Sequence, residues 1–210
     1  MSLHTQPPTV LTLGDDALLT VIMAHGRNRA AEDMARVARR LDVPARYLLL
    51  SADDKTWYPA GFMADFDSNE PALSAAITHI ETVVTDAIAA GTPAERLVVG
   101  GFSQGACLIA EWLARRPRRI GGALFFTGGL IGPEGTTWPD RPALSGMPAY
   151  LVSAENDAWV PASRVRETKA WMERSGIDLR YTMFEQRDHE ISDPEIDAAR
   201  GLLDEIAAKS

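Results

Sequence analysis

The sequence predicts an α/β fold in which a mostly parallel, twisted sheet of about seven strands carries helices on both faces. Short apolar runs typical of buried strands alternate with longer helical patterns, which is the order expected of such a sheet. Apolar residues make up 46% of the 210 residues and charged residues 24%, so a disordered or fibrous chain is excluded. A chain of this length fits one core, and we expect residues 1–210 to form a single domain.

The predicted strands and helices follow one another along the whole chain. The strands are predicted at residues 9–13, 20–24, 45–50, 97–99, 122–126, 149–153 and 179–184. The helices are predicted at residues 30–41, 71–90, 104–115, 162–175 and 194–208. Gly91 and Gly176 each follow a helix, as helix-terminating glycines often do, and Asp193-Pro194 places a capping residue and a first-turn proline before the last helix.

Two long stretches, 51–70 and 127–148, fit neither a strand nor a helix. The first is rich in aromatic side chains, and the second holds four prolines, five glycines and Trp138. Loops of this length in compact domains are often functional, and in this fold they follow the carboxyl ends of strands, where ligands bind. No insertion is long enough to form a separate cap domain, so we expect an open site.

Charge and cysteine content exclude several classes of protein. A formal net charge of -8 argues against a nucleic-acid binder, because neutralising phosphates takes clustered Lys and Arg side chains. The N-terminus has neither a signal-peptide pattern nor a membrane span, so we expect a soluble, cytoplasmic protein. The single cysteine, Cys107, excludes an intramolecular disulfide and a multi-cysteine zinc site, and we expect it to be a buried packing residue.

The strongest local motif is the pentapeptide Gly-Phe-Ser-Gln-Gly at 101–105, which matches the pattern G-x-S-x-G. It lies between a predicted buried strand and a predicted helix. The two glycines permit a sharp turn and close packing of the strand against the helix, so that the hydroxyl of Ser103 projects at a helix N-terminus. This context predicts that Ser103 is a nucleophile.

A serine hydroxyl is a poor nucleophile at neutral pH and needs a base within hydrogen-bond distance. With this motif the residues follow in the order Ser, acid, His, and His189 is the only histidine after Ser103. It follows the last predicted strand, so a loop carries it to the carboxyl edge of the sheet. For His4, in an N-terminal tail that we expect to be mobile, and for His79, within a helix, we predict solvated or packing roles.

The acid that orients His189 is expected in the loop after the strand at 149–153, which offers Glu155 and Asp157. We predict Asp157, because it directly precedes the turn into the next helix, whereas Glu155 could equally be a solvated charge. Asp188 is a third candidate, but neighbouring side chains seldom face one another well enough to hold an imidazole ring.

The oxyanion of an acyl-transfer reaction needs hydrogen-bond donors, each worth about 100- to 1000-fold in rate. One is predicted to be the backbone N–H of Gln104, the residue after the nucleophile. The second is expected in the turn after the strand at 20–24, where we predict the backbone N–H of Arg27. His25 precedes the serine, so we predict an orienting or packing role for it. Asn28 could donate from its side chain or only form the turn.

Several ordered segments together carry a resemblance to a known family. They are His25-Gly26-Arg27 with Ala31-Glu32-Asp33-Met34, Thr56-Trp57-Tyr58-Pro59, Gly101-Phe102-Ser103-Gln104-Gly105-Ala106, Asn156-Asp157 with Val160-Pro161 and Arg164-Val165-Arg166-Glu167-Thr168, and His189-Glu190-Ile191-Ser192. From about residue 21 to residue 200 the chain resembles the phospholipase/carboxylesterase family of α/β-hydrolases, which includes the acyl-protein thioesterases. The resemblance implies an α/β-hydrolase fold and no metal or organic cofactor. The residues it implies are the triad Ser103, Asp157 and His189 and the oxyanion donors Arg27 and Gln104.

Three positions depart from what is usual in that family. Ser153 stands where a glycine is common at the start of the acid loop, Arg187-Asp188 replaces a glycine-containing approach to the histidine, and Asn28 replaces a small residue after the oxyanion turn. None of these changes removes a triad member. They bear on substrate preference, because Asn28, Arg187 and Asp188 could add charge or bulk at the mouth of the site.

These features predict a hydrolase of small-molecule carboxylic esters with short to medium, mostly apolar acyl groups. We expect the substrate to contact Trp57, Tyr58, Phe62, Met63 and Trp159. No nucleic-acid partner and no membrane span are expected, and the sequence makes no prediction of oligomeric state. The alternatives are a thioesterase or lysophospholipase with the same triad, and a non-catalytic binding module that kept the fold.

Overall fold

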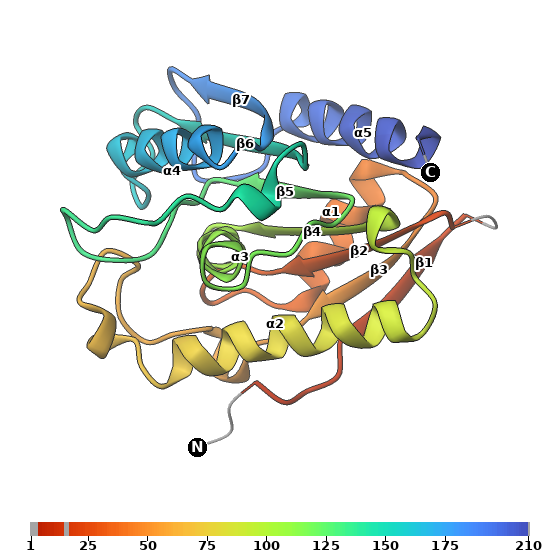
Figure 1. The fold of residues 1–210 in the computed structure, drawn as a ribbon, viewed down its shortest axis with the longest axis horizontal. Coiled ribbons are helices and arrows are strands. Elements are labelled where there is room, and N and C mark those ends of the chain that lie inside the picture. Colours follow the sequence, from red (N-terminus) through yellow and green to blue (C-terminus); the bar gives the residue numbers. More distant parts are fainter. Residues whose placement is uncertain (1–3, 15–16, 210) are drawn as a thin grey trace.

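The computed structural model describes residues 4–14 and 17–209, which form one seven-stranded sheet with helices on both faces (Figure 1). The strands are β1 (Thr9–Leu13), β2 (Leu19–Ala24), β3 (Ala45–Leu50), β4 (Leu97–Phe102), β5 (Gly122–Phe126), β6 (Pro148–Ala154) and β7 (Asp178–Phe184). The α-helices are α1 (Ala31–Leu41), α2 (Ala72–Ala89), α3 (Gln104–Arg115), α4 (Ala162–Arg174) and α5 (Asp193–Ala208). The strand order is β1-β3-β2-β4-β5-β6-β7, and only β1 pairs in an antiparallel direction.

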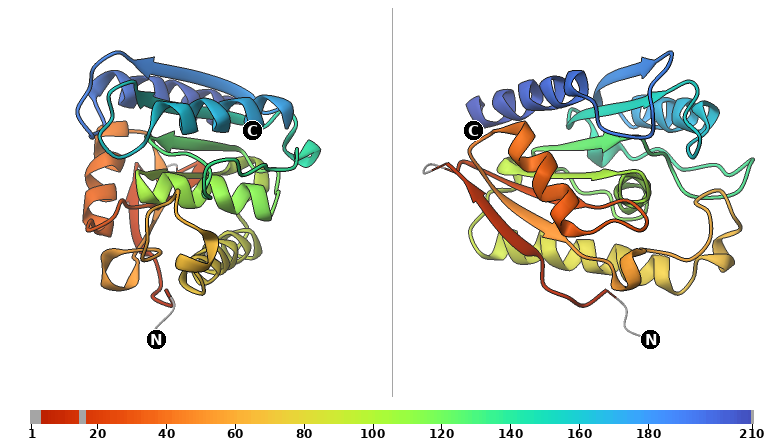
Figure 2. Two further views of the ribbon diagram at one scale, coloured as in Figure 1. Left: turned by 90° about the vertical axis from the view of Figure 1, so that its left-hand side faces the viewer. Right: turned by 180° about the vertical axis from the view of Figure 1, so that it is seen from behind.

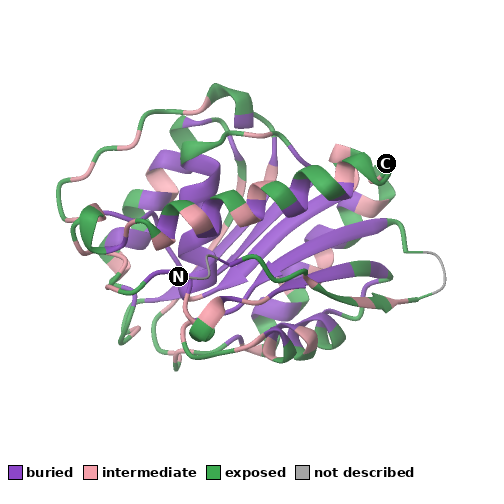
Figure 3. Cartoon of the chain, turned by 90° about the horizontal axis from the view of Figure 1, so that it is seen from below, coloured by how far each residue is buried: buried purple, intermediate pink, exposed green. Residues whose placement is uncertain are grey.

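Alternate residues of the central strands point to opposite faces of the sheet and build two apolar cores. On one face, Ile22 of β2 and Val99 of β4 pack with α2, α3 and α4. On the other face, Val21 and Val98 pack with α1 and α5, which Figure 2 shows from behind in orange and blue. In Figure 3 the central strands are buried along most of their length while the helices expose their outer sides. Burial of this apolar surface is the main term that stabilises such a fold.

The predicted fold class is confirmed, and each predicted strand and helix has a counterpart within a few residues. The largest difference is β4, which was predicted to end at Val99 but continues to Phe102. The sequence did not predict this extension because it contains Gly100 and Gly101, and glycine is disfavoured in strands. In the fold, parallel neighbours β2 and β5 pair with this part of β4 from both sides, which outweighs the local preference.

Two irregular segments follow the carboxyl ends of β3 and β5, as predicted. The first contains the short 3-10 turns Asp53–Lys55 and Phe66–Ser68, and the second contains Pro142–Leu144. Residues 127–147 are all described and form a connection between β5 and β6 with no inserted cap domain. The carboxyl ends of β2, β4, β5 and β6 lie side by side in the sheet, so the loops that follow them meet at one edge.

One helix in the described part of the chain, α2, is long and apolar enough to cross a membrane by length and composition. In this fold its residues Leu73, Ile77, Ile80 and Val84 are buried in the core that α2 shares with α3. Packing against the rest of the domain therefore accounts for its apolar composition.

Candidate active site

Ser103 lies in a sharp turn between β4 and α3 and adopts an unusual backbone conformation. Its φ is 54° and its ψ is -119°, a strained combination of the kind that clusters at functional sites. The flanking glycines are required by packing, because a Cβ on Gly101 would lie 2.5 Å from the carbonyl carbon of Gly105. A Cβ on Gly105 would lie 2.2 Å from the carbonyl oxygen of Ala24. The turn therefore presents the Ser103 side chain at the N-terminus of α3.

His189 lies in the loop between β7 and α5, and its ring bridges two other side chains. The Nε2 atom is 2.8 Å from Ser103 Oγ, and the Nδ1 atom is 2.8 and 3.0 Å from the two carboxylate oxygens of Asp157. Phe102 and Trp159 flank the ring, with centroids 5.0 and 6.5 Å away. In the neutral tautomer that suits both contacts, Nδ1–H donates to the carboxylate and Nε2 accepts from the hydroxyl.

Asp157 follows β6, and its carboxylate is fully buried. The backbone N–H groups of Trp159 and Val160 both donate to Oδ1 at 2.9 Å. Burial opposes ionisation, but the hydrogen bonds from His189 and from these two amides together lower the pKa of Asp157 below its ordinary value. The carboxylate is therefore ionised at neutral pH and can stabilise an imidazolium.

The two rival carboxylates lie in other surroundings. Glu155 forms an exposed ion pair with Arg166, and it belongs to the same loop as Asp157. Asp188 is exposed, and none of the hydrogen bonds of His189 within the described residues goes to its side chain. Of the three acids considered, the fold brings only Asp157 to the ring.

His25 is buried, with both ring nitrogens engaged. Nδ1 is 2.8 Å from the carbonyl oxygen of Gly26, and Nε2 accepts the backbone N–H of Ala52 at 3.0 Å. Burial lowers the pKa of His25, which keeps the ring neutral. Its geometry fits the packing and orienting role expected of it and leaves no nitrogen free to act as a base.

His4 occupies a different place from the one predicted. The sequence suggested a mobile tail, but the side chain of His4 is buried, and its Nε2 atom donates to the carbonyl oxygen of Trp57 at 2.9 Å. Its other nitrogen accepts the backbone N–H of Asp53 at 3.2 Å. His79 of α2 stacks with the Trp57 ring, with centroids 6.5 Å apart. Both histidines belong to the packing around Trp57.

The backbone amides of Arg27 and Gln104 are available beside Ser103. Both residues line the same pocket as the serine. Across residues 4–14 and 17–209, no group accepts a hydrogen bond from either amide. Two amides beside a nucleophile can receive the negative charge that develops on a carbonyl oxygen, and the N-terminus of α3 adds to this effect.

The side chains of the same two residues hold the first irregular segment. The guanidinium of Arg27 donates to the carbonyl oxygens of residues 58–60 at 2.6 to 2.9 Å. Gln104 accepts the N–H of Trp57 at 3.1 Å and donates to the carbonyl oxygen of Tyr58 at 2.9 Å. Hydrogen bonds from these two side chains thus connect the pocket wall to the residues that carry the two amides.

A pocket of about 520 Å³ opens beside Ser103, a volume suited to a small-molecule ligand. Three of the residues expected to contact the substrate line it, namely Tyr58, Phe62 and Trp159. Tyr58 is almost completely buried, whereas Trp159 is 71% exposed at the mouth. The remaining lining residues are Gly26, Arg27, Asn28, Arg29, Gly61, Phe102, Ser103, Gln104, Cys107, Val160 and His189.

The other two residues expected to contact the substrate lie outside this lining. Trp57 is fully buried, and its Nε1–H donates to the carbonyl oxygen of His25 at 2.8 Å, so it packs the core. Met63 is partly buried and does not line the pocket either. Large apolar side chains in a loop can face the core or a cavity, and the pattern along the chain does not distinguish the two.

Cys107 was expected only to pack the core, yet it also lines the pocket. It is 1% exposed and lies one helical turn beyond Ser103, on the same face of α3. Burial raises the pKa of its thiol to about 12, so the group remains neutral at physiological pH. The spacing of four residues from Ser103 is the signal that could have identified it as a pocket residue.

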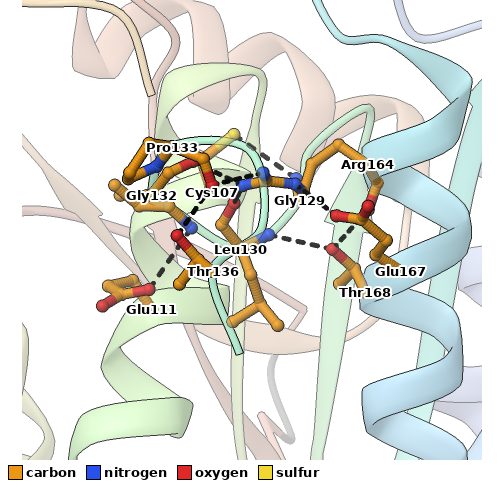
Figure 4. A network of polar contacts seen from close by, with 11 residues as sticks. Cys107, Glu111, Gly129, Leu130, Gly132, Pro133, Thr136, Arg164, Glu167 and Thr168 are labelled. Atoms are coloured by element: carbon orange, nitrogen blue, oxygen red, sulfur yellow. Dashed lines mark hydrogen bonds and ion pairs between the residues drawn. The ribbon is translucent and has the colours of Figure 1, made fainter. Parts of the chain in front are cut away.

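Behind the pocket, a buried polar network fixes the second irregular segment (Figure 4). Arg164 of α4 is 1% exposed, and its guanidinium donates to three carbonyl oxygens within residues 130–133 at 2.8 to 3.1 Å. Its Nε atom is paired with Glu167 at 2.8 Å. Thr168, one turn later, accepts the N–H of Leu130 at 2.9 Å. The charge and donors of Arg164 are thus matched, as burial requires.

The same segment connects α3 to the pocket wall. The N–H of Ile131 donates to the carboxylate of the buried Glu111 at 3.3 Å, and burial raises the pKa of that carboxyl. Gly132 then donates its N–H to the carbonyl oxygen of Phe62 at 2.8 Å. The polar network therefore supports the wall that Phe62 forms, although the side chains of Glu111, Arg164 and Thr168 do not line the pocket.

The sequence pattern that defines the Phospholipase/Carboxylesterase family matches residues 13–206. Acyl-protein thioesterase 1 from Eremothecium gossypii is 28% identical over 129 residues, which cover 59% of this chain and 53% of that relative. The matched part thus spans about half the length of this curated relative.

Solved structures extend the similarity over nearly the whole chain. A phospholipase/carboxylesterase from Dyadobacter fermentans DSM 18053 superposes with a TM-score of 0.86 at 33% identity, covering 97% of this chain and 98% of that one. A carboxylesterase from Bacillus cereus superposes with a TM-score of 0.77 at 18% identity, covering 94% and 93%. At that lower identity the likeness concerns the fold alone.

Proposed function

Since the chain belongs to the phospholipase/carboxylesterase family of esterase-type hydrolases, we propose that it is a serine carboxylesterase acting on esters of short to medium acyl chains. One observation carries the proposal. Ser103, His189 and Asp157 form a continuous hydrogen-bonded chain beside two backbone amides that have no other acceptor in the described structure. A serine nucleophile requires this arrangement of base, orienting acid and oxyanion donors.

In the proposed acylation step, His189 Nε2 takes the proton of Ser103 as Oγ forms a bond to the ester carbonyl carbon. The carbonyl oxygen becomes an oxyanion, which accepts hydrogen bonds from the amides of Arg27 and Gln104. Asp157 stays ionised and stabilises the imidazolium. When the oxyanion collapses, the bond to the leaving oxygen breaks and the imidazolium returns its proton to that oxygen, which leaves as the alcohol.

In the deacylation step a water molecule replaces the alcohol. His189 takes a proton from the water as the water oxygen attacks the acyl carbon, and the bond to Ser103 Oγ breaks as that oxygen regains a proton. The products are the carboxylic acid and the free enzyme. The acyl group would occupy the pocket of about 520 Å³. Each further methylene it buries there would contribute about 0.8 kcal/mol until the wall is reached.

A thioesterase is the second candidate function, favoured by the likeness to acyl-protein thioesterase 1. The same residues would act, but a thiolate leaves more readily than an alkoxide, so proton donation by His189 would matter less. A lysophospholipase would also use these residues with another leaving group. A non-catalytic binding module would keep the fold without turnover.

Labelling with a fluorophosphonate probe tests the nucleophile, with Ser103→Ala as the control. We expect stoichiometric labelling of the parent and none of the variant. A panel of p-nitrophenyl esters and the matched thioesters, with acyl chains of graded length, then separates the two enzymatic candidates by their kcat/KM. A folded parent protein that is neither labelled nor active on any member of the panel would refute the enzymatic proposal.

We also propose that the protein works in the cytoplasm. Its one cysteine is free and buried, which suits a reducing compartment where disulfides are rare. Cell fractionation with an antibody against the native protein tests this, and recovery in a membrane or secreted fraction would contradict it.

A further inference from the structure

A buried cation lies in the loop that carries His189. Arg187 precedes the histidine by two residues, and its side chain is only 6% exposed. By contrast, Arg180 on the preceding strand β7 is 43% exposed. Burying a charge is costly unless it is paired, so the partners of Nη1 and Nη2 indicate what the side chain holds together, whereas its Nε has no hydrogen-bond partner within the described residues.

Three segments meet at this guanidinium. Nη2 donates to the hydroxyl oxygen of Thr127, directly after β5, at 2.5 Å. Nη1 donates to the carbonyl oxygen of Glu190, the residue after the histidine. Nη1 also lies 3.4 Å from the carboxylate of Glu195 in the first turn of α5. One side chain therefore joins both sides of the histidine to a neighbouring strand and a helix.

The partners outside the loop are themselves fixed. Thr127 has a φ of 54° and donates its N–H to the carbonyl oxygen of Val152 in β6 at 2.8 Å. Glu195 is fully buried, and its second carboxylate oxygen accepts both the N–H and the hydroxyl of Ser192 at 2.6 Å. These groups offer Arg187 a rigid platform on the sheet and at the start of α5.

The loop combines one packed ring, that of His189 between Phe102 and Trp159, with several residues that are exposed. Its exposed residues are Glu185, Gln186, Asp188 and Glu190. We propose that Arg187 is a positioning residue for His189, whose guanidinium closes the 187–190 turn and pins it to β5 and α5. This keeps the ring between the nucleophile and the buried carboxylate. The inference rests on the proposed function, because it takes His189 as the base.

A small displacement of the base lowers turnover more than binding, and a misplacement of about 1 Å can cost about 100-fold in rate. Arg187→Met removes all the contacts, but it also leaves the buried carboxylate of Glu195 without its cation. We therefore expect this variant to lose stability as well as kcat, so it does not separate the two effects by itself.

The double variant Arg187→Met/Glu195→Gln separates them, because it removes both buried charges. We expect its Tm to recover toward that of the parent, while kcat stays lower by about 10- to 100-fold and KM changes little. Recovery of kcat together with Tm would mean that Arg187 acts only through stability, and would overturn the inference.

Two further variants complete the test. Arg187→Lys keeps a positive charge beside Glu195 but lacks the planar fork that reaches three segments, so we expect an intermediate kcat. Arg180→Met removes the cation of an exposed ion pair with Glu205 and serves as the matched control, with kcat unchanged. An equal loss in the control would show that the effect is not specific to the 187–190 turn.

A readout independent of turnover is the NMR signal of the Nδ1 proton of His189, which reports the hydrogen bond to Asp157. We expect this signal in the parent and its loss or broadening in the double variant. Fluorophosphonate labelling keeps the two proposals distinguishable. An unlabelled parent contradicts the proposed function, whereas a labelled parent and a double variant labelled at the same rate contradict the positioning role alone.

Discussion

The hydrogen-bonded trio and the pocket beside it share Ser103 but are held by different kinds of contact. In the trio, directional hydrogen bonds of 2.8 to 3.0 Å join the side chains of Ser103, His189 and Asp157, which follow β4, β7 and β6. The pocket wall at Tyr58 and Phe62 is held mainly through its backbone carbonyl oxygens, which accept hydrogen bonds from the side chains of Arg27 and Gln104 and from the N–H of Gly132.

The difference separates two kinds of response to substitution. A directional contact fails when a single atom is replaced, because the next residue in the chain of hydrogen bonds loses its partner. An apolar wall changes by degrees, since its contribution scales with the area that it buries. Changes in the trio should therefore alter the rate by orders of magnitude, and changes in the pocket should alter the preference among substrates.

The largest effect is expected for Ser103→Ala, because no covalent bond to the substrate can then form. In a serine protease, loss of the nucleophile costs about 10⁶-fold in kcat, and oxyanion donors and binding supply the residual rate. We expect a loss of similar order here. Ester hydrolysis and thermal unfolding measured on the same preparation provide the check. Near-normal turnover in a folded variant would contradict the assignment of the nucleophile.

Asp157→Asn is expected to lower kcat by about 10⁴-fold, since an amide cannot stabilise the imidazolium and favours the wrong tautomer of His189. Glu155→Gln and Asp188→Asn are the matched controls, and both should stay close to the parent. The three kcat values are compared at a fixed pH near 7. If Asp188→Asn is the most damaging of the three, the carboxylate has been assigned to the wrong residue.

A smaller effect is expected in the pocket, where Phe62→Ala should move the acyl-chain optimum to longer chains. Burying two more methylenes contributes about 1.6 kcal/mol, which corresponds to roughly 15-fold in the ratio of kcat/KM for long over short esters. Met63→Ala is the control, because Met63 lies outside the pocket lining. Acyl-length profiles with p-nitrophenyl esters decide the matter, and identical profiles for parent and Phe62→Ala would place the acyl group elsewhere.

The smallest effect on rate is expected at Cys107. Cys107→Ala should keep most of the activity and lose about 1 kcal/mol of stability, because it removes a buried sulfur. With a pKa of about 12, the parent thiol is ionised to only about one part in 10⁴ at pH 8, and ionisation increases as the pH rises. Alkylation by iodoacetamide should therefore be slow at pH 8 while the protein is folded. Rapid modification of the native protein would show that the thiol is neither buried nor neutral.

The sequence determined the features that depend on residues close together along the chain. Hydrophobic periodicity located the strands and helices, and the glycines at 101 and 105 indicated the turn at Ser103, since only small residues fit between β4 and α3. The chain order expected with this motif then pointed to His189 and to the loop after β6, where Asp157 was preferred to Glu155 because it directly precedes the turn into the next helix. These patterns are informative because local sterics and backbone geometry constrain them before any long-range contact forms.

Only the tertiary structure decided which way the remaining side chains face. Trp57 turned to the core, where His4, 53 residues earlier in the chain, contacts it, whereas Phe62 in the same loop lines the pocket. Arg187, which the sequence suggested as a charge at the mouth of the site, is buried against Thr127, 60 residues away. The partners of such side chains belong to segments that are distant along the chain. Whether these side chains are buried therefore depends on how the sheet brings the strand ends together, and no local pattern predicts it.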